Sequence, residues 1–424
     1  MRFAPPRLRG IGAFARACCA AVALGGLGLF AVENAGCNNT SASGAQGSTS
    51  AVASATEVAT VASSAPSTAV VASASAPPRP VHPDLPEPDL IASSIPEQRA
   101  AMVRRMKVML RLDDTQVAKL EQTLADSISI VGQGNPAITE YAMTRKECIA
   151  RRQAADALDA DDPQCGGPYM VPVWDPTVGQ TKADAKLCID QFEYPDIPCE
   201  YPMTWVSARE AALLCDAVGK RLCDAHEWEG ACAGAVHDPD TEYVWNRPRK
   251  EAKSRHNKER EIVWAYGAKK DHTKCAMASK KTKTCQPSGF KKCGSNTYPA
   301  GSFPDCKSPF GVFDQHGNVA EHMNLPLRPS ELASRGGMGE TEMKGSWFIF
   351  QTYEAHEDDC RWRAPDWHVT KVMSRDSHQN YHLGFRCCKD IGAAAKPESA
   401  SAPAPSASAS ANPPAKKKGK KRAK

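Results

Sequence analysis

The sequence predicts an irregular α+β fold that is rich in disulfides and preceded by a helical hairpin. Three observations predict it. Between residues 161 and 391 the apolar segments are short and are interrupted by Gly and Pro, a pattern unlike that of βαβ repeats. Fourteen of the 17 cysteines lie between Cys148 and Cys388, an even number in a dense block. Capping boxes mark a few helices, one before this region and two within it.

Residues 1–37 are interpreted as an export signal, possible in two forms. Basic residues precede an uncharged apolar run over 17–32, which is short for a membrane span and typical of a signal peptide. The run is followed by Asn34-Ala35-Gly36-Cys37, which resembles the processing box of bacterial lipoproteins. That box prefers Leu where Asn34 stands, so ordinary cleavage nearby is the alternative. We expect a bacterial protein of the periplasm or outer membrane, attached to the membrane by a lipid on Cys37.

Two segments have compositions that oppose folding. Residues 38–93 form a linker of mostly Ala, Ser, Val, Thr and Pro, and the tail 392–424 repeats this mixture before a Lys-rich end. The net charge of +5 becomes −2 without the seven basic residues of the last nine positions. The charge of the body therefore gives no reason to expect specific nucleic-acid binding. The basic tail is either a solvated terminus or a binder of polyanions.

Residues 94–160 are predicted to be helical. Ser94-Ile95-Pro96-Glu97 has the form of a capping box with Pro in the first turn. A second helix is expected to begin at Asp113 or Asp114. The apolar residues of the two helices recur at helical spacing: Met102, Met106, Met109 and Leu110, then Val117, Leu120 and Leu124. We interpret the methionines as core residues rather than metal ligands.

Two further helices are predicted inside the main domain, residues 161–391. Ser207 and Glu210 form a capping box before a helix that places Cys215 on its apolar face. Asp224 leads a similar box before a helix that carries Cys232. Both cysteines are expected to point inward, where a disulfide would fix the helix to the core.

The 14 cysteines of the domain region are predicted to form disulfides, as expected in an exported chain. The alternative is a zinc site made by four thiolates. The candidate ligands are Cys275, Cys285, Cys293 and Cys306. None of them forms the close C-x-x-C pair that structural zinc sites favour.

A series of short motifs carries a family resemblance. They are Cys188-Ile189-Asp190-Gln191-Phe192-Glu193-Tyr194-Pro195, Trp205-Val206-Ser207, Gly219-Lys220-Arg221-Leu222-Cys223, Gly317-Asn318-Val319-Ala320-Glu321, Lys344-Gly345-Ser346-Trp347 and Leu383-Gly384-Phe385-Arg386-Cys387. In this order they resemble the formylglycine-generating enzyme, or sulfatase-modifying factor, family over about residues 165–390. The resemblance implies an irregular fold related to C-type lectins, with disulfides Cys215–Cys387 and Cys232–Cys360. Adjacent Cys388 is a rival for Cys387, which would leave one of the two for Cys223.

The copper chemistry of that family is not expected here. By the resemblance, two copper-binding thiols stand three and eight residues after the Ser of the Gly-Ser motif. Counted from Ser346, these positions hold Ile349 and Glu354. A register shifted to Gly336-Gly337 gives Thr341 and Ser346 instead, so neither alignment supplies a thiol. A reactive Cys360 is the remaining alternative.

Iron is not expected either. Relatives that use non-haem iron take histidine ligands partly from an N-terminal helical bundle, whereas residues 38–160 contain only His82. Four histidines of the domain are the candidate ligands of an iron site, and we interpret them as ordinary core or surface residues: His356, His368, His378 and His382.

The resemblance implies a calcium site that this sequence retains. Asp314 and Glu321 would supply carboxylates, and Gly317 and Val319 would supply backbone carbonyls, which are the hard oxygen ligands that Ca²⁺ prefers. The alternative is a plain turn with solvated acids. Near the substrate groove, however, Ala320 and His322 stand where the family usually has bulky Trp residues.

The sequence therefore favours a calcium-stabilised binding or scaffold module of the cell envelope without enzymatic activity. Its partner would be an envelope protein or polymer that the sequence does not identify. The alternative is a divergent metal-dependent oxidase, of the formylglycine-generating or the non-haem iron type. Fold resemblance does not decide between them, because activity depends on the residues of the site.

Overall fold

The computed structural model describes residues 92–285, 289–366 and 369–392. The predicted export signal, Cys37, nearly all of the linker and the basic tail lie outside the described residues. Within the described residues, no helix has the length and apolar character needed to cross a membrane.

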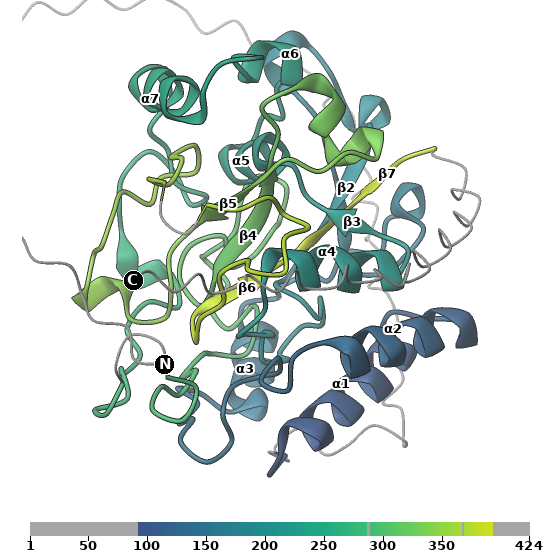
Figure 1. Ribbon diagram of the computed structural model, residues 1–424, viewed down its shortest axis with the longest axis vertical. Coiled ribbons are helices and arrows are strands. Elements are labelled where there is room, and N and C mark those ends of the chain that lie inside the picture. The colour runs from purple at the N-terminus through teal and green to yellow at the C-terminus, as the bar shows by residue number, and fades with distance from the viewer. Residues whose placement is uncertain (1–91, 286–288, 367–368, 393–424) are drawn as a thin grey trace, which may run out of the picture. The chain divides into compact units, whose positions relative to one another are not determined.

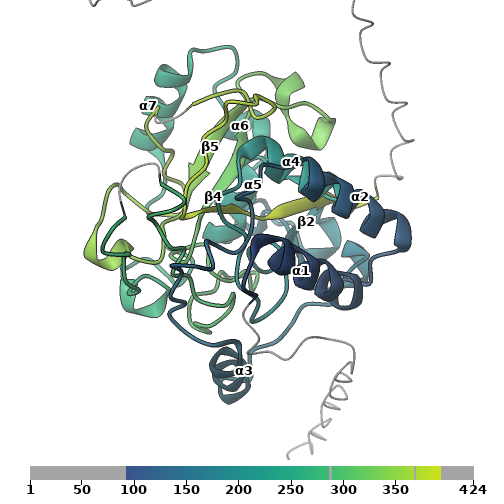
Figure 2. The ribbon, with the colours of Figure 1, turned by 60° about the horizontal axis from the view of Figure 1, so that its bottom comes forward.

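Within the described residues, three α-helices precede the first strand: α1 (Ile95–Met109), α2 (Asp114–Asp126) and α3 (Arg145–Ala154). The side chains of Ser94 and Asp113 cap α1 and α2, as the sequence predicts. A short turn joins the two helices, which lie side by side (Figures 1 and 2). Met102 and Met106 are buried in the main apolar core, so the methionine stripe serves packing.

A four-stranded antiparallel sheet joins the two ends of the domain. Its order is β1 (Met170–Val173), β2 (Leu187–Asp190), β7 (Cys387–Asp390) and β3 (Arg221–Leu222). The last strand in sequence thus lies between two early ones, with Cys388 opposite Ile189 on one side and Arg221 on the other. This pairing joins the C-terminal strand of the domain to its N-terminal strands.

A second sheet of three strands carries the sequence motifs of the site. Its order is β5 (Glu340–Lys344), β4 (Ala320–Leu325) and β6 (Leu383–Phe385). Strand β4 is antiparallel to β5 and parallel to β6, and all of its residues are buried. The Gly317–Glu321 motif therefore enters the sheet at its central strand.

Four helices accompany the sheets: α4 (Ala208–Ala217), α5 (Ala225–Ala233), α6 (Pro239–Glu242) and α7 (Arg249–Glu259). Helices α4 and α5 pack on the strands, whereas α6 and α7 follow as a separate excursion (Figure 1). The described residues also form short 3₁₀ turns at Pro163–Cys165, Pro176–Val178, Lys182–Asp184, His272–Lys274, Pro329–Glu331, Ala333–Arg335 and Phe350–Thr352. The irregular α+β fold preceded by a helical hairpin is confirmed.

Seven disulfides use all 14 cysteines of the described residues. They are Cys148–Cys199, Cys165–Cys188, Cys215–Cys387, Cys223–Cys388, Cys232–Cys360, Cys275–Cys306 and Cys285–Cys293. The two pairs that the family resemblance implies are both present. Cys388 bonds to Cys223, and the four cysteines considered for zinc form two disulfides instead.

Candidate functional site

The two positions expected to hold copper thiols point in different directions. Ile349 is 3% exposed and packs in an apolar cluster with Trp347, Phe348 and Phe350. Glu354 lies at the surface with 48% of its side chain exposed, and its carboxylate is 2.6 Å from Lys270 Nζ. The pair therefore offers no thiol and no common ligand position.

The Ser of the Gly-Ser motif has a structural role in this chain. Ser346 is fully buried, and its Oγ accepts a hydrogen bond of 2.9 Å from the N–H of Gly317. The hydroxyl also lies 3.5 Å from Asp358 Oδ2. The other oxygen of that carboxylate, Oδ1, accepts a hydrogen bond from the Trp264 indole. These contacts connect the segment after β5 to the loop before β4.

Cys360 is bonded to Cys232, so it is not a free thiol. His316 lies beside this disulfide, with its Nε2 3.3 Å from Cys232 Sγ and 3.0 Å from the N–H of Ala265. The three residues stand close enough to share a metal ion, but sulfurs bonded to each other are not thiolates. The same applies to the group of Cys223, Glu227 and Cys388.

A cavity of about 160 Å³ lies beside Trp347 and is lined mainly by apolar atoms. Three histidines reach it, His322 from β4 and His378 and His382 from the segment before β6. His322 Nε2 contacts the Val206 carbonyl at 3.0 Å, whereas Nδ1 of His382 is buried and has no hydrogen-bond partner among the described residues. Burial lowers the pKa of His322 to about 4 and, together with the charge of His378, that of His382 to about 3. Both imidazoles are therefore neutral at physiological pH.

These histidines do not form a preformed metal site. In the described part of the chain, three groups of side chains bring their ligand atoms within 4.8 Å of one another, and none includes the cavity histidines. His356 packs against Trp347 and Trp362 rather than joining the others. His368 lies outside the described residues.

The residues implied to bind calcium surround a buried cluster of carboxylates. Glu321 makes two hydrogen bonds with Arg386, of 2.7 and 2.6 Å, and accepts a third from the Trp228 indole. Asp314 accepts from the N–H of Gly301 through one oxygen, while its Oδ1 is buried without a hydrogen-bond partner among the described residues. The Asp314 oxygen fits a cation, and Glu321 would have to share its oxygens with Arg386.

Sequence reasoning assigned no role to Glu193, which completes this cluster. Its carboxylate accepts from the Asn318 amide at 2.6 Å and from the N–H of Val319 at 3.0 Å. Burial, with the charges of Asp314 and Glu321, raises the pKa of Glu193 well above its usual range. Three buried carboxylates thus face the guanidinium of Arg386, an excess of negative charge. Its place in the Cys188–Pro195 motif was the signal that the sequence offered.

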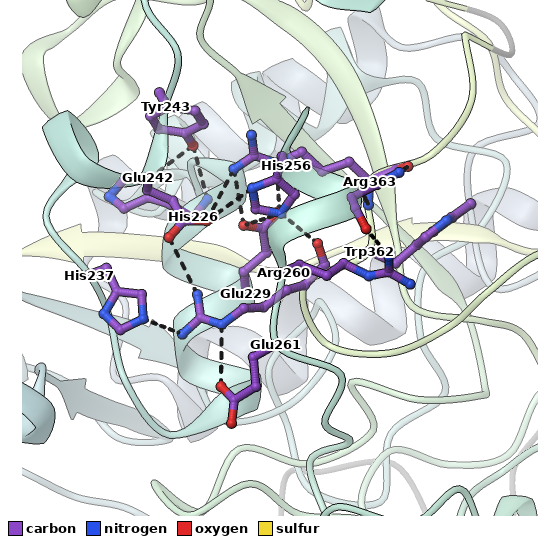
Figure 3. Close-up of polar contacts among 12 residues, drawn as sticks. His226, Glu229, His237, Glu242, Tyr243, His256, Arg260, Glu261, Trp362 and Arg363 are labelled. Atoms are coloured by element: carbon purple, nitrogen blue, oxygen red, sulfur yellow. Dashed lines mark hydrogen bonds and ion pairs between the residues drawn. The ribbon is translucent and has the colours of Figure 1, made fainter. Parts of the chain in front are cut away.

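A second buried network of charged residues holds helices α6 and α7 to the rest of the domain. Glu229 on α5 lies 2.5 Å from Lys344 Nζ and 3.0 Å from Arg363 Nε. Figure 3 shows Glu242 and His256 beside it, with 3.2 Å between His256 Nδ1 and the Glu242 carboxylate. Glu229, Glu242 and His256 are close enough to share a metal, but the neighbouring cations already compensate the carboxylates. We interpret this network as structural.

Comparisons with known proteins agree with the sequence motifs. The model of the sulfatase-modifying factor enzyme 1-like domain matches residues 134–391. No curated protein matches this chain.

Similar solved structures include CarF, which is 14% identical with a TM-score of 0.28 over 48% of this chain and 86% of that chain. The M1 variant of the Major Tropism Determinant is 12% identical, with a TM-score of 0.24 over 54% of this chain and 59% of its own. The I1 variant is 13% identical, with a TM-score of 0.22 over 53% of this chain and 45% of its own. At these TM-scores the assignment rests on the family model, which matches more than half of the chain: this protein belongs to the sulfatase-modifying factor family, whose domain spans residues 134–391.

Proposed function

We propose that this protein is a binding or scaffold module of the cell envelope that does not generate formylglycine. The observation that carries the proposal is that neither position where the resemblance implies a copper thiol holds a cysteine. Ile349 is in the core and Glu354 is at the surface, while every cysteine of the described residues is in a disulfide. A member of the family that lacks the reactive thiols but retains the buried framework is suited to binding rather than oxidation.

The cavity beside Trp347 is the binding site that the geometry favours. Small volume and an apolar lining suit an apolar group about the size of one side chain. His382 lines the cavity and its buried Nδ1 has no hydrogen-bond partner among the described residues, so a polar atom on that group would satisfy it. The ligand would thus be an apolar group with a single polar substituent, such as a side chain of a partner protein.

Calcium would stabilise the module rather than take part in a reaction. Calcium is favoured by the buried cluster of Glu193, Asp314 and Glu321, in which burial and mutual repulsion raise the pKa of Glu193, and by Asp314 Oδ1, which has no hydrogen-bond partner among the described residues. A buried carboxylate oxygen without a partner is costly unless a proton or a cation satisfies it. The hard oxygen ligand suits Ca²⁺ better than a transition metal.

The envelope location rests on the sequence. The apolar run before Cys37 is typical of an export signal, and a framework of seven disulfides is typical of proteins that mature in an oxidising compartment. Lipidation of Cys37 would attach the module to a membrane through the linker 38–93.

The metal content of the full-length protein, purified from the envelope fraction without chelators, tests the proposal. Calcium alone, near one ion per chain, supports a calcium-stabilised module. Copper or iron in stoichiometric amount would instead support the alternative, a divergent oxidase. Protein that is found only in the cytoplasm, without cleavage of its N-terminus, would contradict the envelope location.

A further inference from the structure

One segment of the domain carries positive charge without any acidic residue. Between His272 and Pro304 the sequence contains six lysines and no acidic residue. Five of these lysines fall within 280–292, and we call them the lysine loop: Lys280, Lys281, Lys283, Lys291 and Lys292. The near-neutral body of the protein therefore has a strongly asymmetric surface.

A disulfide holds the two arms of the lysine loop together. Cys285 and Cys293 are bonded, with 4.3 Å between their Cα atoms. The hydroxyl of Thr284 lies 3.3 Å from the Lys292 carbonyl, and the Thr282 hydroxyl accepts from the N–H of Gly294 at 3.0 Å. These contacts place the lysines of one arm beside those of the other.

The base of the loop is fixed to the domain. The Asn296 side chain donates to the Lys280 carbonyl at 2.8 Å, and the Asn135 side chain donates to the Phe290 carbonyl at 2.8 Å. The Phe290 ring packs edge-on against Trp205, with 5.4 Å between ring centroids. The lysines are thus presented on a support that is anchored at both arms.

The five lysines are exposed, and within the described residues none forms an ion pair. Other surface lysines do find acidic partners, for example Lys119 with Asp216 and Lys270 with Glu354. Holding like charges together without counter-charges raises the electrostatic energy of the folded protein. An external anion relieves this repulsion.

We propose that the lysine loop docks this domain on a membrane surface that bears anionic phosphate headgroups. Lysine is a compact point charge, suited to a diffuse layer of phosphates, whereas bidentate recognition of a single carboxylate or phosphate favours arginine, which the loop lacks. No lysine of the loop lines the cavity beside Trp347, although the charge of Lys281 helps to lower the pKa of His382, which does line it. Clusters of four to eight basic residues are typical of binding to anionic lipid.

Vesicle binding of the full-length protein tests this proposal. The probe is phosphatidylcholine vesicles with and without phosphatidylglycerol, measured at low and at physiological salt. All proteins carry Lys→Gln and Arg→Gln replacements in the last nine residues, so that the basic tail does not mask the loop. The loop variant replaces all five loop lysines with Gln.

The matched control removes the same charge from exposed positions outside the loop: Arg247→Gln, Lys250→Gln, Arg255→Gln, Lys258→Gln and Lys269→Gln. At roughly fivefold in affinity per lysine near the surface, the loop variant should bind phosphatidylglycerol vesicles about a hundredfold more weakly or worse. The control should change by about fivefold or less.

Equal losses in the two variants would overturn the proposal, because net charge alone would then explain binding. Binding that needs no phosphatidylglycerol would also overturn it. A protein that ignores the vesicles but binds polyglutamate through the loop would replace the membrane with an acidic protein partner. Intact disulfides and unchanged circular dichroism in each variant ensure that the comparison concerns folded protein.

Discussion

Glu354 and Lys270 form an ion pair at the protein surface, with 2.6 Å between the carboxylate oxygen and Nζ. Glu354 stands where the family resemblance implies the second copper thiol, and Ile349, at the first such position, is buried among aromatic rings. An aliphatic side chain offers no lone pair, and a single carboxylate is too hard a ligand for Cu(I). The two positions where the resemblance implies copper thiols therefore hold a buried apolar side chain and a surface ion pair.

The buried network around Glu229 should be the most sensitive part of the framework. Replacing Glu229 with Gln removes the nearest counter-charge of the buried Lys344 and Arg363. We expect the free energy of unfolding to fall by about 3–5 kcal/mol, measured by chemical denaturation. Glu259→Gln removes an exposed pair with Arg255 and should cost about 1 kcal/mol or less. Similar losses in the two variants would contradict a structural role for the network.

The disulfides should contribute according to the length of the loop that each one closes. Cys215–Cys387 spans a sequence separation of 172 residues and Cys285–Cys293 only 8. In a chain-entropy model that treats each bond alone, the two bonds contribute about 5 and about 2.5 kcal/mol respectively. Because Cys223–Cys388 already joins the segments beside Cys215 and Cys387, the long-loop variant replaces both of these bonds with Ala pairs. Denaturation under non-reducing conditions measures both. A larger loss for the short loop would show that chain entropy does not govern these bonds.

Calcium should raise the stability of the protein through Asp314. At a free concentration of one hundred times Kd, binding to the native state adds about 2.7 kcal/mol to the free energy of unfolding. Asp314 has a positive φ of 56°, so Asp314→Gly removes the carboxylate without backbone strain and should abolish the increment. Asp305→Gly, at an exposed position nearby, should retain it. A calcium increment that survives in the Asp314 variant would exclude this site.

Asp358 should make the protein more sensitive to acid. Burial opposes ionisation, but hydrogen bonds from His272 and Trp264 and the neighbouring His316 lower the pKa of Asp358 to about 2. Because this pKa lies below its unfolded value near 4, the stabilisation is present above about pH 4 and is lost as the pH falls towards 2. We expect Asp358→Asn to remove about 2 kcal/mol of the difference in unfolding free energy between pH 5 and pH 2.

Glu357→Gln provides the control for this pH dependence, since the neighbouring Glu357 is exposed. Thermal melting across the acid range should follow the parent protein in this variant. An acid dependence that is unchanged in the Asp358 variant would assign the acid sensitivity to other carboxylates.

Helices with local start signals could be predicted from the sequence, and α7 could not. Ser207 and Glu210 bond to each other's backbone N–H groups within one turn, so the sequence alone identifies the start of α4. Helix α7 has no such cap. It is held instead by Arg249, which pairs with Glu342, and by His256, which contacts the Arg361 carbonyl. Those partners are distant in the sequence and left no local pattern.

The candidate site likewise combines features that the sequence could predict with features that only the folded chain shows. Counting from Ser346 gave the positions at which the resemblance implies thiols, because the motif fixes the spacing. Only the folded chain shows that Ile349 and Glu354 diverge, or that Arg386 holds Glu321. Cys148 and Cys199 likewise meet across a separation of 51 residues, and any of the 14 cysteines was an equally good partner by spacing alone.

The central claim is that this domain has lost the oxidation of a peptide cysteine, and the direct measurement is an aldehyde assay. The full-length protein is incubated in air with a sulfatase-type cysteine peptide, with and without added copper, and the product is followed by mass spectrometry. An active formylglycine-generating enzyme serves as the positive control. We predict no conversion of cysteine to formylglycine in either condition. Aldehyde formation that is lost on Cys360→Ala would contradict the account and restore an oxidase.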